Sequence, residues 1–262
     1  MKSRRLITIK MIGLTSRARV QHIKENPVPH NGLVLDVGCG SGELVDALQW
    51  DRFHVIGLDK DAQRLVALNA AMRRIGESCN LVAADVSSLP FRNSSFGAVY
   101  CMEVINMLDQ DSNALTELAR VLKRNGMCTL SVPYEQYPAI YDPINRLLAK
   151  MGLTHLQIGI WSPGVKRLYK PSELSSKLRS LGINPVTIHY IGRWLIPILE
   201  NYLSLLLYYE IFSSHKNRPP SKRQEVNPSL FNAFSKVLDC IIKLDQVPNM
   251  YGTHFIIKAK KF

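Results

Sequence analysis

The sequence is most informative at Leu33-Val34-Leu35-Asp36-Val37-Gly38-Cys39-Gly40-Ser41-Gly42-Glu43, where an apolar run meets three alternating glycines. The apolar, β-branched run predicts a buried parallel strand that ends at an acid. Glycine has no Cβ, so the turn that follows can adopt positive φ and let a ligand approach the backbone closely. The pattern becomes helical from Glu43, and the free N–H groups of a helix N-terminus favour an anionic group. These features predict the strand, turn and helix that open a nucleotide-binding α/β fold.

Two more apolar runs of this chain also end in acids. Residues 53–59 end at Asp59, about 20 residues after the glycines, where a carboxylate that binds ribose is expected. Residues 80–85 end at Asp85. Because parallel strands end at one edge of a sheet, we expect Asp36, Asp59 and Asp85 to line one crevice.

These motifs resemble those of the class I S-adenosylmethionine (SAM)-dependent methyltransferases of the methyltransferase type 11 kind. The resemblance covers residues 32–134 closely, and residues 171–190 and 252–260 more loosely. It implies SAM as the cofactor and a doubly wound, Rossmann-like α/β fold. The implied sheet has seven strands and is mostly parallel, and its last strand, residues 253–260, inserts antiparallel between the fifth and the sixth.

The resemblance also implies a set of cofactor-binding residues. Asp36 would orient the glycine turn and the methionine ammonium, and Asp59 would accept hydrogen bonds from both ribose hydroxyls. Asp85 would accept from the adenine amine, the Val86 N–H would donate to a ring nitrogen, and the Cys101 backbone would face the ammonium. The full implied set is Asp36, Gly38, Cys39, Gly40, Gly42, Asp59, Lys60, Asp85, Val86 and Cys101.

We predict a single methyltransferase domain over residues 1–262, because a chain of this length can bury one substantial core. The SAM-binding core is expected at residues 28–134 and an insertion on the substrate side at residues 135–170. A helical cap is expected at residues 193–248, between the last two strands.

Hydrophobic periodicity predicts the elements around this core. A helix packed beside the site is expected at residues 16–24, and amphipathic helices are expected at residues 61–75 and 231–242. A further helix is expected to contain Leu115, Leu118, Ala119 and Leu122 and to stop at Asn125 and Gly126. Another should begin at Pro171 with Ser172 as its N-cap. The fourth, fifth and sixth strands are expected at residues 97–101, 127–133 and 183–191.

No motif in the sequence identifies a general base. The family usually has Glu-His near Asn106 and Met107, and this chain has neither there. The candidates for taking a proton from an acceptor are His155, Tyr134, Tyr141 and His189. Proximity alone is the alternative. Arg17 and Arg19 are expected at the surface, with contact to the cofactor carboxylate as the alternative.

Residues 194–212 form a second apolar feature, in which 14 of 19 residues are hydrophobic. Glu200 and Glu210 interrupt it, and acids within a lone membrane span are costly, so we do not predict a transmembrane helix. A cap helix over the active site and an interfacial helix both fit. The basic segment 215–223 that follows favours contact with an anionic membrane.

The net charge of +12 comes from 33 Lys and Arg against 21 Asp and Glu, and residues 1–30 contribute +6 of it. This balance favours an anionic partner, with a solvated basic arm as the alternative. The five cysteines are scattered and none has the spacing of metal ligands, so we predict no metal site and a reducing compartment. We expect a cytoplasmic protein, with peripheral contact at the cytoplasmic face of a membrane as a further expectation.

The predicted function is SAM-dependent methyl transfer to an O, N or C atom of a small acceptor that is apolar or lipid-linked. One alternative is an RNA or other nucleic-acid methyltransferase, although no nucleic-acid recognition module accompanies the core. A second alternative is a non-catalytic SAM-binding partner subunit. The sequence leaves the oligomeric state open.

Overall fold

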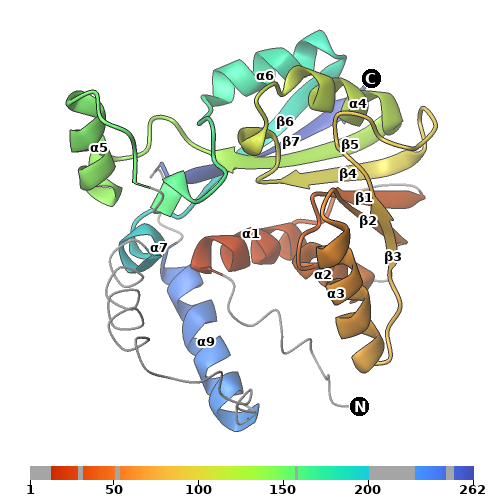
Figure 1. The fold of residues 1–262 in the computed structure, drawn as a ribbon, viewed down its shortest axis with the longest axis horizontal. Coiled ribbons are helices and arrows are strands. Elements are labelled where there is room, and N and C mark those ends of the chain that lie inside the picture. Colours follow the sequence, from red (N-terminus) through yellow and green to blue (C-terminus); the bar gives the residue numbers. More distant parts are fainter. Residues whose placement is uncertain (1–12, 29–31, 51–53, 157–158, 201–227, 246–250) are drawn as a thin grey trace.

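The fold is an α/β sandwich built on a seven-stranded sheet with the strand order β3-β2-β1-β4-β5-β7-β6 (Figure 1). The computed structural model describes residues 13–28, 32–50, 54–156, 159–200, 228–245 and 251–262. The strands are β1 Leu33–Val37, β2 Val55–Asp59, β3 Asn80–Ala83, β4 Phe96–Met102, β5 Leu122–Pro133, β6 Ile183–Ile191 and β7 His254–Lys261. Neighbouring strands pair in parallel, except that β7 is antiparallel to both β5 and β6. The predicted fold class is confirmed.

Helices cover both faces of this sheet. The α-helices are α1 Leu14–Glu25, α2 Glu43–Trp50, α3 Ala62–Arg74, α4 Ser112–Val121, α5 Pro143–Lys150, α6 Pro171–Ser180, α7 Leu195–Ile198 and α9 Pro228–Leu244. Short 3-10 helices are η2 Ile105–Met107, η3 Ala139–Tyr141 and η4 Gly159–Trp161. Figure 1 shows α1, α2 and α3 on one side of the sheet and α4 and α6 on the other.

Alternation along β1 explains why the sheet buries two separate cores. Leu35 and Val37 face the core formed with α4 and α6, whereas Val34 faces the core formed with α1, α2 and α3. Successive side chains of a strand point to opposite faces, so a run that is apolar throughout can be covered on both sides. Asp36 shares the face of Val34 and is the polar exception in this strand.

The boundary between α4 and β5 differs from the prediction. We expected the helix to run to Asn125 and Gly126, but it ends at Val121 and β5 begins at Leu122. Leu122 pairs with Phe96 of β4, and the register then jumps so that Ala98 pairs with Met127. Residues 123–126 therefore form an irregular bulge, in which Asn125 adopts φ +63°. Strand pairing, which is non-local, overrides the helical pattern of this segment.

The first turn of α6 also corrects a prediction. Ser172 was expected to cap this helix, but the N-cap is Lys170, and no side chain caps it. Pro171 occupies the first helical position, where its missing N–H removes no hydrogen bond. By contrast, the Asp61 side chain caps α3, because its carboxylate accepts from Gln63 N and Arg64 N at 3.0 and 3.1 Å.

The segment between β6 and β7 is helical where the structure describes it, in α7 and α9. Both helices contact α1, so they lie on the side of the sheet that carries α1, α2 and α3. Most of the apolar stretch 194–212 lies outside the described residues, and its predicted role stays a prediction. Within the described part of the chain, no helix is long and apolar enough to cross a membrane.

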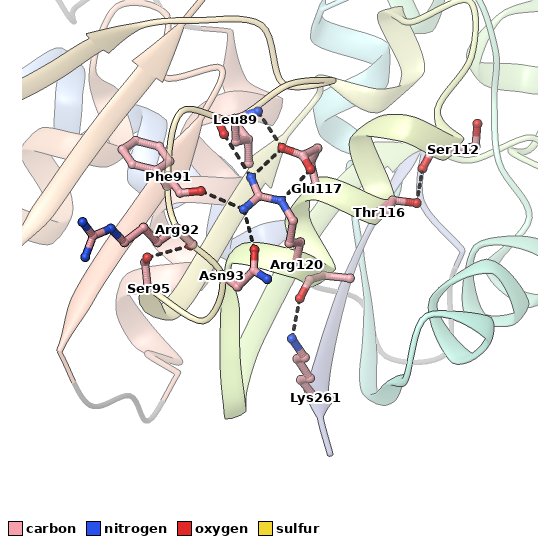
Figure 2. A network of polar contacts seen from close by, with 11 residues as sticks. Leu89, Phe91, Arg92, Asn93, Ser95, Ser112, Thr116, Glu117, Arg120 and Lys261 are labelled. Carbon is pink, nitrogen blue, oxygen red and sulfur yellow. Dashed lines mark hydrogen bonds and ion pairs between the residues drawn. The ribbon is translucent and has the colours of Figure 1, made fainter.

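A network centred on Arg120 fastens the loop after β3 to α4 (Figure 2). The Arg120 guanidinium donates to the backbone carbonyls of Phe91 and Leu89 at 2.7 and 3.0 Å and pairs with Glu117 at 2.7 Å. Glu117 in turn accepts from Leu89 N at 2.7 Å. The predicted adenine-binding residues Asp85 and Val86 lie at the start of the same loop, so this network fixes the segment that directly follows them.

Candidate active site

A cavity of about 510 Å³ opens at the carboxyl ends of β1, β2 and β4. This volume is within the range of pockets that hold small ligands and cofactors. One part of its wall is the glycine turn with the loops after β2 and β3. Other parts come from α1, the loop after β4, the first residue of β7, the η4 segment and Glu200.

The glycine turn is held against β2 by its backbone. Gly38 N and Cys39 N both donate to Leu58 O, at 2.6 and 2.9 Å. Gly38, Gly40 and Gly42 have φ values of +71°, +50° and +82°, in the region that L side chains rarely adopt. A Cβ at Gly38 would collide with Val104, whereas a Cβ at Gly40 would meet only a carbonyl oxygen at 3.9 Å. The backbone at Gly40 is thus left open toward the cavity.

Asp36 brings a buried acid to this cavity. Its side chain is almost fully buried, and its Oδ2 has no hydrogen-bond partner among the described residues. Burial, with the nearby carboxylates of Glu43 and Asp59, raises the pKa of Asp36 to about 8. An unsatisfied buried acceptor with neighbouring negative charge favours a cationic ligand group in the cavity.

The other two strand-end acids line the same cavity. Asp59 accepts from Gly40 N and Asp61 N, both at 2.9 Å, so it joins the glycine turn to the start of α3. Asp85 accepts from Ser87 N at 2.7 Å and is exposed, and the adjacent Val86 is buried. The structure therefore brings Asp36, Asp59 and Asp85 together at one edge of the sheet.

The other residues of the implied cofactor set divide into two groups. Cys39 and Lys60 contribute to the cavity wall together with Gly38, Gly40 and Val86. Gly42 and Cys101 do not line it: Gly42 packs toward Leu68, and Cys101 is fully buried in β4.

At the other part of the cavity lies a polar cluster that we did not predict. Glu103 Oε1 contacts Arg19 Nη2 at 3.1 Å and accepts from Ser131 Oγ at 2.8 Å. Its Oε2 lies 3.7 Å from His254 Nε2 and accepts from Asn106 Nδ2 at 3.3 Å. Arg19, Glu103 and His254 all line the cavity.

Arg19 was expected at the surface, and this expectation is wrong. The whole residue is only 8% exposed, and Arg19 Nε also donates to Ser131 Oγ at 3.0 Å. Arg17 lies outward on the same helix and pairs with Asp239 of α9 at 2.8 Å.

The position of His254 at the site could have been predicted from the direction of the last strand. The last strand of the sheet is antiparallel, so it begins at the edge where the parallel strands end. Its first residue is therefore brought to the site.

The four residues considered as bases do not line this cavity. Tyr134 and Tyr141 are buried beside it, with Tyr141 Oη donating to the Arg193 carbonyl. His155 is exposed and stacks on Trp161 at 4.0 Å between ring centroids. His189 stacks on His22 at 4.0 Å in a different cavity, behind β6 and β7. This placement argues against a direct role for them in proton transfer here.

Comparison with known proteins identifies the family. Residues 35–130 match the model of a family described as a methyltransferase domain. These residues are thus a methyltransferase domain of the SAM-dependent kind. The matched residues run from β1 into β5, and thus contain the glycine turn and all three strand-end acids.

Curated relatives of this methyltransferase are moderately similar to it. A cycloartenol-C-24-methyltransferase of Arabidopsis thaliana is 28% identical over 180 residues, which are 66% of this chain and 52% of that protein. The chain thus spans about half the length of this relative. A ubiquinone biosynthesis O-methyltransferase of Dechloromonas aromatica is 25% identical over 172 residues, which are 64% of this chain and 71% of that protein.

Solved structures share the fold of this methyltransferase. A putative methyltransferase from Bacillus halodurans has a TM-score of 0.56 and 18% identity, and the match covers 93% of this chain and 97% of that one. The [4+2]-cyclase SpnF has a TM-score of 0.57 and 18% identity, covering 93% and 81% of the two chains. Since a cyclase has this fold, the fold by itself does not specify the reaction.

The residues present in this methyltransferase fit SAM. The open backbone at Gly40 admits a ligand close to the chain, and the orphaned Asp36 Oδ2 provides an acceptor for a cationic group. Asp59 and Asp85 place further acceptors along the same wall. When bound, SAM supplies a methyl group that its positively charged sulfur has already activated.

Proposed function

We propose that this methyltransferase transfers the methyl group of SAM to a small acceptor that is apolar or lipid-linked. The single observation that carries this proposal is the continuity of the cavity. Its wall passes from Asp36, Asp59 and Asp85 to an apolar stretch in the loop after β4, and then to the cluster around Glu103. That apolar stretch consists of Met102, the last residue of β4, and of Val104, Met107 and Leu108 after it.

The residues of the chain would contribute binding, orientation and exclusion of water. The glycine turn and the three acids hold the cofactor half of the cavity, and the apolar stretch packs against the acceptor. An acceptor held in line with the bond that breaks gains most of its rate from positioning, and a dry cavity strengthens each polar contact. The relatives named for methylation of cycloartenol at C-24 and for O-methylation in ubiquinone biosynthesis support an apolar acceptor.

An exposed apolar stripe supports the lipid-linked part of the proposal. Ile140, Ile144, Leu147 and Met151 recur at helical spacing along η3 and α5 and are 42–67% exposed. Leu153 and Leu156 extend the stripe and are about half exposed. Figure 1 shows α5 projecting from the body of the fold. Contiguous exposed apolar side chains of this kind mark interaction surfaces.

The occupant we propose for this stripe is the surface of an anionic membrane. Residues 135–170 carry five Lys and Arg against two Asp and Glu, and the whole chain carries +12. An apolar helix face with surrounding positive charge is the combination that binds anionic lipid surfaces. Gly159 and Ser162 of the same segment line the cavity, so a lipid-borne acceptor would reach the site directly. All five cysteines are free, which supports a location at the cytoplasmic face.

Methyl transfer is tested with SAM carrying a labelled methyl group and a total extract of lipids and small molecules. We expect label in an organic-soluble product, identified by mass spectrometry. Label in RNA instead would favour a nucleic-acid methyltransferase. Absence of transfer in a protein that binds SAM would favour a non-catalytic subunit.

Membrane contact is tested by flotation with vesicles of phosphatidylglycerol and phosphatidylcholine. We expect wild-type protein to float and Leu147→Asp/Met151→Asp protein to stay in solution. Val66→Asp is the matched control, because Val66 is 70% exposed on α3, away from the stripe. Equal flotation of all three proteins would contradict the assignment of this surface.

A further inference from the structure

The structure brings a histidine and a carboxylate together on the acceptor side of the cavity, and neither was in the set implied by the family resemblance. His254 begins β7, and Glu103 follows β4 directly. These are the strand ends on either side of β5, whose Ser131 hydroxyl donates to Glu103. Three strands and α1 thus converge on one carboxylate.

The backbone at Glu103 is unusual in a way that points to function. Glu103 adopts φ +56°, which is rare for a residue with a side chain. This conformation is held by its N–H, which donates to Ser131 O at 2.9 Å. Strained residues of this kind cluster at active sites, because the surrounding structure must over-determine them. The strain here directs the carboxylate toward Arg19, Ser131 and His254.

His254 is placed to accept a proton. Its Nδ1 lies 3.0 Å from Thr253 Oγ1, and its Nε2 lies 3.7 Å from Glu103 Oε2. The contact with Thr253 is a hydrogen bond, whereas the contact with Glu103 is too long for one. When Thr253 Oγ1 accepts from Nδ1–H, the lone pair of the neutral ring lies on Nε2, and His254 lines the cavity. A proton arriving on Nε2 would then face a carboxylate.

Burial and the neighbouring charged groups set the protonation state of His254. Burial lowers the pKa of His254 to about 4, Glu103 raises it against this effect, and Arg19 lowers it. The imidazole is therefore neutral at pH 7. The charged groups that act on His254 are Glu103 in the loop after β4 and Arg19 on α1.

We propose that His254, supported by Glu103, is the general base for an acceptor hydroxyl in this methyltransferase. The proposal rests on the proposed methyl transfer and commits it to an O–H acceptor. The hydroxyl proton passes to His254 Nε2, and the oxygen forms a bond to the methyl carbon as the carbon–sulfur bond breaks onto sulfur. The products are a methyl ether, S-adenosylhomocysteine and an imidazolium, which Glu103 stabilises until the proton leaves to water.

The first test locates the pair relative to the reacting methyl group and needs no acceptor. Sinefungin carries an amine where SAM carries its sulfonium methyl, and S-adenosylhomocysteine has no group there. By calorimetry we expect wild-type protein to bind sinefungin at least about tenfold more tightly than S-adenosylhomocysteine, because a charged hydrogen bond contributes that much. In Glu103→Gln this preference should fall to about twofold or less. Asp239→Asn is the matched control, because it breaks the ion pair with Arg17, which lies on the same helix as Arg19 but outside the cavity.

The second test measures proton transfer in the labelled-methyl assay. We expect His254→Asn to lower the rate by about a hundredfold or more, with S-adenosylhomocysteine affinity within about twofold of wild type. The wild-type rate should be flat between pH 6 and pH 8, because His254 is already neutral. The His254→Asn rate should rise about tenfold per pH unit, since the acceptor must then ionise before it reacts. A merely structural role for His254 would not change this slope.

The outcomes separate the two proposals. Equal binding of sinefungin and S-adenosylhomocysteine by wild type, or an unchanged preference in Glu103→Gln, would overturn the assignment of this pair. A wild-type pH profile kept by His254→Asn would overturn the base. A folded wild-type protein that binds neither ligand would instead refute the proposed function.

Discussion

Replacing Asp36 with Asn should stabilise the cofactor-free protein and weaken its binding of SAM. Burial, with the carboxylates of Glu43 and Asp59, raises the pKa of Asp36 to about 8. Because folding raises the pKa of this Asp, its ionisation destabilises the folded chain. The destabilisation grows as the pH rises above the pKa in the unfolded chain, about 4, and levels off above the pKa in the folded chain. This pKa difference of about four units between the folded and the unfolded chain lowers the free energy of unfolding by about 4 kcal/mol at pH 7.

The Asn side chain keeps the shape of the protonated acid but cannot ionise. Its extra N–H lacks an evident partner and costs about 1 kcal/mol, so we expect a net gain of about 3 kcal/mol in the free energy of unfolding at pH 7. Near pH 4 the gain should vanish, because Asp36 is then protonated in the folded chain and half protonated in the unfolded one. The same substitution removes an acceptor for a cation, so SAM affinity at pH 8 should fall about tenfold.

The assay is urea unfolding of both proteins between pH 4 and pH 8, with SAM affinity measured in parallel by calorimetry. Asp85→Asn is the control for the stability measurement, because it removes an exposed acid from the same cavity. The reasoning fails if the stability difference between wild type and Asp36→Asn does not change with pH. It also fails if the substitution destabilises the protein at pH 7 or leaves SAM affinity unchanged at pH 8.

Two further predictions concern the elements that hold the site. Gly42→Ala should lower the free energy of unfolding by about 2–3 kcal/mol and also weaken SAM binding, because an alanine there is strained by the positive φ and its Cβ collides with Leu68. Gly76 has a similar φ but open space around it, so Gly76→Ala should cost about 1 kcal/mol. Urea unfolding measures both. Arg120→Ala should lower the free energy of unfolding by about 2 kcal/mol, because it releases the loop after β3. Arg120→Lys should be intermediate, because it keeps the charge but not the branched guanidinium. Equal stability of wild type and both variants would show that this network is dispensable.

The cofactor half of the site was predictable because its signals are local. Alternating glycines define a turn, an apolar run defines a strand, and an acid at the end of each run has a fixed place in a parallel sheet. Asp36, Asp59 and Asp85 are therefore brought together by the rule that all parallel strands end at one edge. No knowledge of side-chain packing was needed to place them at one cavity.

The errors arose where distant segments decide the structure. Leu122 belongs to β5 because it pairs with Phe96, although its own neighbourhood resembles the end of a helix. Arg19 is buried because α1, which precedes the sheet in the chain, folds back over the cavity and pairs with Glu103. A charge on a short amphipathic helix gives no sign of this, since the same pattern describes a solvated face.

The acceptor half of the site was missed for a related reason, and that reason bears on its chemistry. Glu103, Arg19 and His254 are separated by more than 80 residues in each direction along the chain, and only the antiparallel insertion of β7 brings His254 to the site. Residues that bind the shared cofactor can be recognised by family resemblance. The residues that we propose meet the acceptor come from the first helix, the loop after β4 and the last strand, where substitutions need not disturb the glycine turn. The base and the acceptor of such an enzyme must therefore be sought in the three-dimensional contacts of those segments.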